Sequence, residues 1–458
     1  MTNLDVNIDL VKKYNVPGPR YTSYPSALYF SEDVNQEKIF DQIRSNNETK
    51  KPISLYFHLP FCYSLCWFCG CTQVITKNQD KGPVYMEYLD REMKQMDHLI
   101  NNERSTVQMH WGGGTPTFLL PDEIRRLGDM IHSHFNFTPD AEVSVEVDPR
   151  RLTNDHVKAL HSAGFNRASL GVQDVNPEVQ KAVHRIQSDE QNENTIKWLR
   201  EEDFESINID LIYGLPHQTA ESFDKTLDAV LAYDPDRFAV FNYAHVPWVK
   251  PAQKLLDADA LPAPEEKLAM LKLIIERLTR SGYVYIGMDH FAKVDDELTI
   301  AQHNKELQRN FQGYSTYAGT DIYAFGMSSI SQVEDVYYQN TKDLQDYYDR
   351  IDAGESPIFK GYILSEDDRI RRQTIMQLMC DMELNFDEMS EKLNIDFKDY
   401  YHHELDTFDD MENDGLLTID DNGLKVTPNG RLFIRNIAMK LDAYVNKKKT
   451  ANRYSKTV

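Results

Sequence analysis

Four of the five cysteines in this chain of 458 residues fall within ten positions, namely Cys62, Cys66, Cys69 and Cys71. The first three, spaced C-x3-C-x2-C, are close enough to hold one metal centre from a single loop. A structural zinc site usually takes four ligands from two separated pairs, and no second pair lies nearby, although Cys71 could be a fourth ligand. A disulfide framework is not expected in so long a chain with an odd cysteine. Thiolates also hold iron–sulfur clusters well, which makes a cluster the favoured interpretation and zinc the alternative.

The cysteines directly follow an apolar run of strand length, Ile53 to Leu59, that ends at Pro60. Three cysteines that ligate a cubane of four irons leave one iron open for a small molecule. The loop, with the aromatic Phe68 just before the last ligand, resembles the cluster loop of the radical S-adenosylmethionine enzymes. That resemblance implies that the open iron binds the amine and carboxylate of S-adenosylmethionine. It also implies that an electron from the reduced cluster cleaves the sulfonium and gives a 5′-deoxyadenosyl radical.

Strand-like apolar runs alternate with amphipathic, helix-like segments over much of the chain, and these elements must position the cysteine loop. The predicted strands cover residues 53–59, 107–111, 143–147, 167–172, 206–212, 238–243 and 283–287. Repeated β–α units of this kind imply a parallel sheet, and this number of units suggests an α/β fold with a full or partial barrel. In such barrels function gathers at the carboxyl ends of the strands.

Polar residues stand at several of these predicted strand ends. Glycines 112–114, followed by Thr115, allow backbone amides to approach a ligand, although a simple tight turn is the alternative. Glu146 could hydrogen-bond to ribose hydroxyls or cap a helix. Asp210 interrupts the apolar run 207–212, where a buried charge without a partner is costly. Each alone could be an ordinary core or surface group, but one polar group per strand end is typical of a ring-shaped site.

A longer set of motifs narrows the resemblance to one family. The chain contains, in this order, PRYTSYP, FHLPFCYSLCWFCGC, HWGGGTPT, VEVDPR, GVQD, NIDLIYGLP, FNYAHVP, GMDHFA and RNFQGYSTYAGTD. From about residue 10 onward it is similar to the oxygen-independent coproporphyrinogen III oxidases. The resemblance implies an oxidoreductase of porphyrin and haem biosynthesis that converts coproporphyrinogen III to protoporphyrinogen IX. Two propionates would each lose CO2 and two electrons and become vinyl groups.

The resemblance also assigns residues, position by position. It implies that Cys62, Cys66 and Cys69 ligate one 4Fe–4S cluster and that Cys71 does not. Together with Tyr56, these three cysteines are the predicted catalytic residues. Two molecules of S-adenosylmethionine are expected. The residues matched to the cluster-bound molecule are Tyr56, Gly113, Glu146 and Ile330. Those matched to the second molecule are Phe68, Gly114, Thr115, Gln173, Arg185, Asp210 and Ala244.

The chain carries a net charge of −23, which argues against nucleic acid or an anionic membrane surface as a main partner. No apolar run approaches the roughly 18 residues of a membrane-spanning helix, and charges interrupt the N-terminus where a signal peptide needs an apolar core. We therefore expect a cytoplasmic protein. We also expect a monomer, reduced by a protein such as flavodoxin or ferredoxin. A substrate with four carboxylates requires a local basic cluster, for which the candidates are Arg20, Arg150, Arg151, Lys293 and Arg309.

The sequence predicts three parts: an N-terminal arm over residues 1–50, a partial-barrel catalytic domain over 51–340, and a smaller, mostly helical domain over 341–458. The aromatic, proline-rich stretch of the arm is interpreted either as packing or as a lid that carries Arg20, with Tyr21 and Tyr24, towards a site.

In the last part, predicted helices at 369–382, 400–412 and 430–444 surround a predicted hairpin over 416–426, a pattern that suggests a winged-helix-like module. Residues 386–421 hold thirteen acids and only two lysines, the wrong sign for DNA, and we expect a cover over the barrel instead. Two other functions fit the motifs: a haem-binding chaperone, or another radical S-adenosylmethionine enzyme that acts on a tetrapyrrole.

Overall fold

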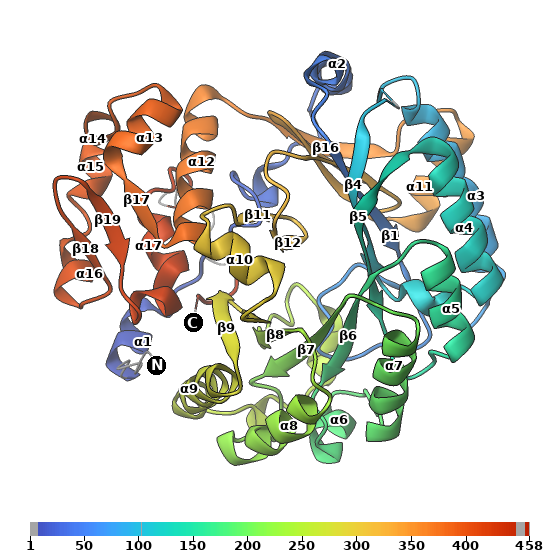
Figure 1. Ribbon diagram of the computed structural model, residues 1–458, viewed down its shortest axis with the longest axis horizontal. Helices are drawn as coiled ribbons and strands as arrows, with labels where there is room; N and C mark the ends of the chain where they lie inside the picture. Colours follow the sequence, from blue (N-terminus) through green and yellow to red (C-terminus); the bar gives the residue numbers. More distant parts are fainter. Residues whose placement is uncertain (1–7, 102, 446–453, 458) are drawn as a thin grey trace.

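The computed structural model describes residues 8–101, 103–445 and 454–457. Its centre is a sheet of twelve strands in the order β16-β15-β14-β13-β1-β4-β5-β6-β7-β8-β10-β9. Figure 1 shows this row of strands curving, with helices along its outer side. Six strands run parallel in chain order: β1 (Ile53–Leu59), β4 (Ser105–Gly113), β5 (Asn136–Val147), β6 (Arg167–Gln173), β7 (Ser206–Tyr213) and β8 (Arg237–Asn242). The predicted parallel sheet is therefore confirmed, in its partial form.

Helices join these strands and cover the outer face of the sheet (Figure 1): α3 (Lys81–Met96), α4 (Pro121–His134), α5 (Asn154–Ser162), α6 (Pro177–Ala182), α7 (Asp189–Glu201), α8 (Ala220–Ala232) and α9 (Pro264–Arg280). Side chains alternate across each strand, so that in β5 Val145 and Val147 are buried in the core with the helices and Glu146 between them is not. The same alternation in β6 and β7 places Gln173 and Asp210 on the inner face. The sheet thus presents its polar residues to one side.

The sheet extends beyond the predicted strands next to β1. There β13 (Asp321–Phe325) pairs in parallel with β1, and β14 (Ile330–Val333), β15 (Val336–Asn340) and β16 (Ile358–Ile363) follow as antiparallel strands. A buried ion pair of 2.5 Å between Arg104 and Asp321 holds the start of β13. Helix α11 (Leu344–Asp352) joins β15 to β16. The sheet continues past residue 340, and where the chain divides into domains stays a prediction.

At the other end of the sheet one expectation was wrong. Strand β9 (Tyr283–Gly287) does not follow β8 as the next parallel strand; it is an antiparallel edge. An unpredicted strand, β10 (His290–Lys293), lies between the two and pairs antiparallel with both. The turn between β9 and β10 consists of Met288, which has a left-handed φ of +53°, and Asp289. The turn therefore lacks the Asn-Gly or Asp-Gly pair by which such a hairpin is usually predicted from sequence. Beyond it lie α10 (Glu297–His303), β11 (Gln308–Asn310) and β12 (Gly313–Ser315).

The last part of the chain forms a small α+β unit beside the open side of the sheet, red in Figure 1. Its strands β17 (Glu383–Asn385), β19 (Gly423–Val426) and β18 (Leu417–Ile419) make one sheet that contains the predicted hairpin. Its helices are α12 (Glu366–Asp381), α13 (Phe386–Leu393), α14 (Phe397–Tyr400), α15 (His402–Leu405), α16 (Asp409–Asn413) and α17 (Ile434–Lys440). The single helix predicted over 400–412 is instead two short helices, α15 and α16, which follow α14.

The N-terminal arm packs against this unit rather than standing free. It contains α1 (Ile8–Tyr14) and α2 (Gln36–Asn46). Tyr14, Tyr21 and Tyr24 are buried in the same apolar core as α12 and α17. None of the helices in the described ranges has the length and apolar character that a membrane crossing requires.

Candidate active site

The cysteine loop begins at β2 (Phe61–Cys62), which pairs in parallel with β3 (Val74–Ile75). Cys66 is buried, Cys62 and Cys69 are half-buried, Cys71 is exposed, and all four are free thiols. The amide of Cys69 donates to the carbonyl of Cys66 at 3.1 Å, which closes the loop. Cys62 interacts electrostatically with both Cys66 and Cys69, so the three predicted cluster ligands lie near one another.

The thiols differ in their acidity. Burial raises the pKa of Cys62 to about 12, although the Thr115 hydroxyl, 3.3 Å from its sulfur, works in the other direction. The pKa of Cys69 falls to about 6, chiefly through a hydrogen bond with the thiol of Cys71. Cys71 thus stabilises the thiolate of a neighbouring predicted ligand.

Two guanidinium groups lie against the sulfur of Cys66. Arg150 Nη2 is 3.5 Å and Arg185 Nη1 is 3.6 Å from it. Both arginines also pair with Asp148, at 2.6 and 3.4 Å. Burial alone would raise the pKa of Asp148, but the two arginines hold it well below its usual range. An ionised Asp148 therefore fixes two positive groups beside a predicted ligand.

The inner faces of β1, β4 and β5 carry a second group of polar side chains. The Gly113 amide donates to Glu146 Oε2 at 3.1 Å, and His110 Nε2 lies 3.6 Å from Oε1. Burial would raise the pKa of Glu146, but His110 and the Gly113 amide keep it below its ordinary value. Tyr56 stacks on His110, with ring centroids 5.9 Å apart, and its hydroxyl lies 3.1 Å from Nδ1 of His58. An ionised Glu146 is suited to accept hydrogen bonds from the hydroxyls of a ligand.

The glycine turn at the end of β4 packs directly on the cysteine loop. Gly113 has φ +114°, and a Cβ there would lie 2.6 Å from the ring of His58. A Cβ on Gly114 would lie 2.3 Å from the carbonyl oxygen of Pro60. The amides of Gly114 and Thr115 each donate to a carbonyl at the start of the loop at 2.9 Å. Glycine is required because no side chain fits between turn and loop.

Asp210, Gln173 and Arg185 meet near the carboxyl ends of β6 and β7. Asp210 accepts hydrogen bonds from Ser169 Oγ at 3.0 Å and Asn208 Nδ2 at 2.8 Å. Burial, reinforced by a nearby carboxylate, raises the pKa of Asp210 to about 7. Among the residues that the structure describes, Arg185 Nε and Gln173 Oε1 are buried without a hydrogen-bond partner. A ligand that carries both an ammonium and a carboxylate would satisfy these groups.

The remaining predicted site residues lie further out. Gln253 Nε2 donates to the carbonyls of Phe68 at 3.3 Å and Ala244 at 3.2 Å, so its side chain ties the cysteine loop to the segment after β8. Ile330 begins β14, two strands away from β1. Ser328, two residues before it, has its hydroxyl 3.3 Å from Nε2 of His58, so Ile330 begins its strand near the group that contains Tyr56.

The donor set fits thiolate ligation of an iron–sulfur cluster. The fit rests on three free thiols of one loop and on two cationic groups at Cys66. Within the described ranges, no group of three or more His, Cys, Asp or Glu side chains is arranged to hold a metal ion. The argument for the cluster is therefore one of chemistry rather than of preformed ligand geometry.

Comparison with known proteins decides the family. The Radical SAM superfamily matches residues 56–230, and the HemN C-terminal domain matches residues 364–433. An oxygen-independent coproporphyrinogen III oxidase from Escherichia coli is 45% identical over 456 residues, 99% of either chain. The chain belongs to the oxygen-independent coproporphyrinogen III oxidases. The oxidase of that name from Synechocystis sp. is 44% identical over 459 residues, 99% of this chain and 98% of that one.

A solved structure shows the same similarity at the level of the fold. The coproporphyrinogen III oxidase from Escherichia coli, described as a radical SAM enzyme, superposes with a TM-score of 0.92 at 43% identity, covering 97% of this chain and 100% of that one. Membership of the oxidase family, within the radical SAM superfamily, implies a 4Fe–4S cluster and S-adenosylmethionine. The predicted family, fold and class of enzyme are confirmed.

Two groups of this oxidase site were not predicted from the sequence. His110 holds Glu146, and Asp148 holds Arg150 and Arg185. Both lie inside motifs already singled out, HWGGGTPT and VEVDPR. The available signal was their position: each stands near the carboxyl end of a strand, where inward-facing polar side chains have a role in the site.

Proposed function

We propose that this chain converts coproporphyrinogen III to protoporphyrinogen IX by removing two propionate carboxyl groups. As each –CH2–CH2–COO− group becomes a vinyl group, it gives up CO2, one proton and two electrons. The observation that carries this proposal is the 45% identity to the Escherichia coli oxidase over 99% of either chain. The free thiols and the polar groups around them supply the chemistry that the proposal needs.

When bound, the cluster and S-adenosylmethionine would supply the radical chemistry that takes a hydrogen atom from the β-carbon of a propionate. Cys62, Cys66 and Cys69 would hold the cluster. Glu146, kept ionised by His110, would accept hydrogen bonds from ribose hydroxyls of the first S-adenosylmethionine. The packing of the glycine turn on the loop holds these groups in a fixed relation.

A second S-adenosylmethionine molecule is part of the proposal. Arg185 would pair with its carboxylate and Asp210 with its ammonium group, and Gln173 has an unused carbonyl oxygen in the same place. Phe68 and Ala244, tied together through Gln253, would form the rim around it.

Two of the five basic residues proposed for the substrate lie together. Arg309 Nη2 donates to the carbonyl of Arg20 at 3.2 Å. Arg309 is buried, and in the described part of the chain its Nε and Nη1 have no hydrogen-bond partner. Arg150, Lys293 and Arg20 each have a carboxylate partner, and Arg151 lies over an aromatic ring. We favour Arg309, for its N–H groups without a partner, and Arg20, for its place beside Arg309, as ligands of substrate carboxylates.

The aromatic residues beside Arg20 do not cover the substrate. Tyr21 and Tyr24 are 2% and 1% exposed, and the Tyr21 hydroxyl donates to Asp442 at 3.0 Å within the core of the last unit. That part of the lid hypothesis was wrong, because these rings are needed to bury the arm. The arm acts instead by holding Arg20 in place.

An anaerobic assay tests the function. The reconstituted protein, with a chemically defined coproporphyrinogen III, a reductant and S-adenosylmethionine, should release CO2 and give a product with the mass of protoporphyrinogen IX. A haem-binding chaperone would bind haem without turnover, and another tetrapyrrole enzyme would give a product of different mass. A flavodoxin or ferredoxin as reductant, a monomeric state and a cytoplasmic location belong to the proposal, and each requires its own measurement.

A further inference from the structure

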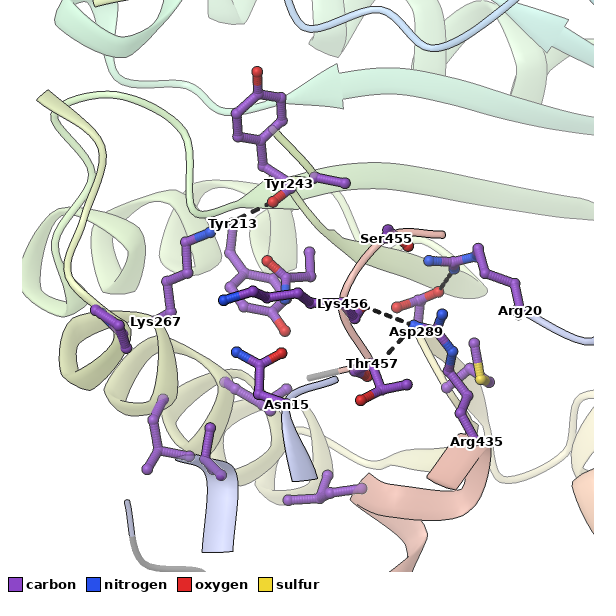
Figure 2. Close-up of a pocket in the computed structure, with 18 of the residues that line it drawn as sticks. Asn15, Arg20, Tyr213, Tyr243, Lys267, Asp289, Arg435, Ser455, Lys456 and Thr457 are labelled. Carbon is purple, nitrogen blue, oxygen red and sulfur yellow. Dashed lines mark hydrogen bonds and ion pairs between the residues drawn. The ribbon is translucent and has the colours of Figure 1, made fainter. Parts of the chain in front are cut away.

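A cavity of about 740 Å³ opens beside Ala244. Its wall comes from the ends of β7 and β8, from α9, from the arm and from residues 454–457, here named the tail segment. Figure 2 shows the side chains of Lys267 and Lys456 pointing into the same space from opposite walls. The volume is that of a ligand pocket, typically about 300–1,000 Å³. Apolar side chains such as Leu271 and Trp248 form much of the remaining wall.

Five lysine and arginine side chains line this cavity: Arg20, Lys267, Arg431, Arg435 and Lys456. Three of them are already engaged. Arg20 forms an ion pair with Asp289, the only acid in the described lining. Arg431 donates to the backbone of β9 at 2.6 Å. Arg435 donates to carbonyls of the arm at 2.8 Å and of the tail segment at 3.1 Å.

The two lysines, Lys267 and Lys456, have weaker contacts than these three arginines. Lys267 donates only weakly, to the carbonyl of Tyr243 at 3.4 Å. Within the part of the chain that the structure describes, neither Lys267 nor Lys456 has an ion pair. Burial lowers the pKa of Lys267, and the charge of Lys456 lowers it further. The neighbouring His245 also has a lowered pKa, through burial and the charge of Lys267. The cavity therefore has a positive potential that no described acid balances.

Backbone hydrogen bonds hold the tail segment in place, so the Lys456 side chain is not needed to seat it. Lys456 forms a β-bridge with Pro17 of the arm. The Thr457 amide donates to the arm at 2.9 Å, and the Ser455 carbonyl accepts from the arm at 3.0 Å. Arg435 adds its hydrogen bonds to the carbonyls of the tail segment. Replacing the Lys456 side chain should therefore leave the tail segment seated.

We propose that Lys267 and Lys456 together bind one carboxylate of the tetrapyrrole substrate, so that the tail segment is part of the substrate site. The inference rests on the proposed function, because coproporphyrinogen III supplies the carboxylate and an apolar ring for the apolar wall. Two ammonium groups in one cavity repel each other until an anion lies between them. A carboxylate has lone pairs for both, and charge-assisted hydrogen bonds of this kind are strong.

The test is a binding titration with coproporphyrin III, the oxidised substrate, which is stable and is not turned over. Quenching of tryptophan fluorescence reports binding, since Trp248 lines the cavity and is 68% exposed. The anaerobically reconstituted protein is compared with Lys267→Gln, Lys456→Gln and Lys456→Arg. Lys158→Gln, an exposed change on the outer helix α5, is the matched control.

Each Gln variant should raise Kd for coproporphyrin III, and KM for coproporphyrinogen III, by about tenfold, the effect of one charged hydrogen bond. Iron content and S-adenosylmethionine binding should not change. Lys456→Arg and Lys158→Gln should stay within about threefold of the wild type. Gln at position 267 keeps a donor for the Tyr243 carbonyl, so a purely structural role predicts no change in Kd.

Binding by both Gln variants within about twofold of the wild type would overturn the inference. The two lysines lie on separate elements, so if one variant does not fold the other still decides. If the wild type binds coproporphyrin III through these lysines but makes no protoporphyrinogen, the proposed function fails and the carboxylate site stands. If the wild type turns over and the variants match it, only the carboxylate site fails.

Discussion

Replacing Asp210 with Asn should make the ligand-free protein more stable while it abolishes binding of the second S-adenosylmethionine. Asp210 is half-buried on the inner face of β7, and its pKa is raised to about 7 because desolvation and a nearby carboxylate disfavour the charge. Asn has nearly the same shape and can accept from Asn208, while its own amide can donate to the Ser169 hydroxyl. The substitution therefore removes a charge and little else.

The sign follows from the two protonation states. A carboxyl whose pKa is raised in the folded state contributes its full stability below the unfolded value and loses it as pH rises towards the folded value. A rise from 3.8 to about 7 corresponds to a loss of about 4 kcal/mol above pH 7. Asn would make neutral hydrogen bonds to Ser169 and Asn208, which are weaker than those of the carboxylate and reduce the expected gain in stability by about 1 kcal/mol. Asp210→Asn should therefore gain about 3 kcal/mol at pH 8, and much less near pH 4.

Urea unfolding of the S-adenosylmethionine-free protein at pH 5, 6.5 and 8 measures this difference. Asp148→Asn is the control with the opposite sign, because two arginines hold the pKa of Asp148 low and its charge is stabilising at neutral pH. Equilibrium dialysis with S-adenosylmethionine should show one site lost in Asp210→Asn. If Asp210→Asn is instead less stable than the wild type at pH 8, the carboxylate is satisfied within the fold and has no unmet need for a ligand.

Three further results are expected. Cys62→Ser, Cys66→Ser and Cys69→Ser should lose iron and sulfide after anaerobic reconstitution, whereas Cys71→Ser and the buried Cys380→Ser should retain them; a Cys71→Ser protein without iron beside an intact Cys69→Ser protein would reverse the ligand assignment. Arg185→Ala should keep its fold and cluster colour but lose turnover, since Arg150 still neutralises Asp148; an unfolded variant would show that the ion pair is structural. Arg20→Ala should raise KM for coproporphyrinogen III by about tenfold without changing iron content, and an unchanged KM would remove Arg20 from the substrate site.

The parallel half of the sheet could be predicted from the sequence because each strand carries its own signal. Apolar residues such as those of β1 and β7 form runs of strand length, and amphipathic helices separate them. The rest of the sheet depends on contacts between distant residues. Strand β13 pairs with β1 and is held by the buried Arg104–Asp321 pair, and nothing local in either segment indicates that partner. Strand β10 is too short and its turn too unusual to be read as a hairpin.

The site, like the sheet, could be predicted from the sequence only in part. Residues carried by motifs were named from the sequence, and the structure places Arg185, Gln173 and Asp210 near one another; their role in binding a ligand stays a prediction. The sequence could not show that Tyr21 and Tyr24 are core residues, because an aromatic arm looks alike whether it packs or covers a ligand. Lys267 and Lys456 lie in no motif, and only folding brings them to one cavity.

That cavity also bears on how a protein with a net charge of −23 accepts a substrate with four carboxylates. Exposed charges are screened over about 8 Å at physiological ionic strength, so the acids on the outer surface contribute little inside the cavity. There, Asp289 is the only acid in the described lining and is neutralised by Arg20, which leaves the unpaired lysines to set the local sign. The net charge of the chain mainly reflects groups on its outer surface. Whether the substrate binds depends on the charges within a screening length of its carboxylates.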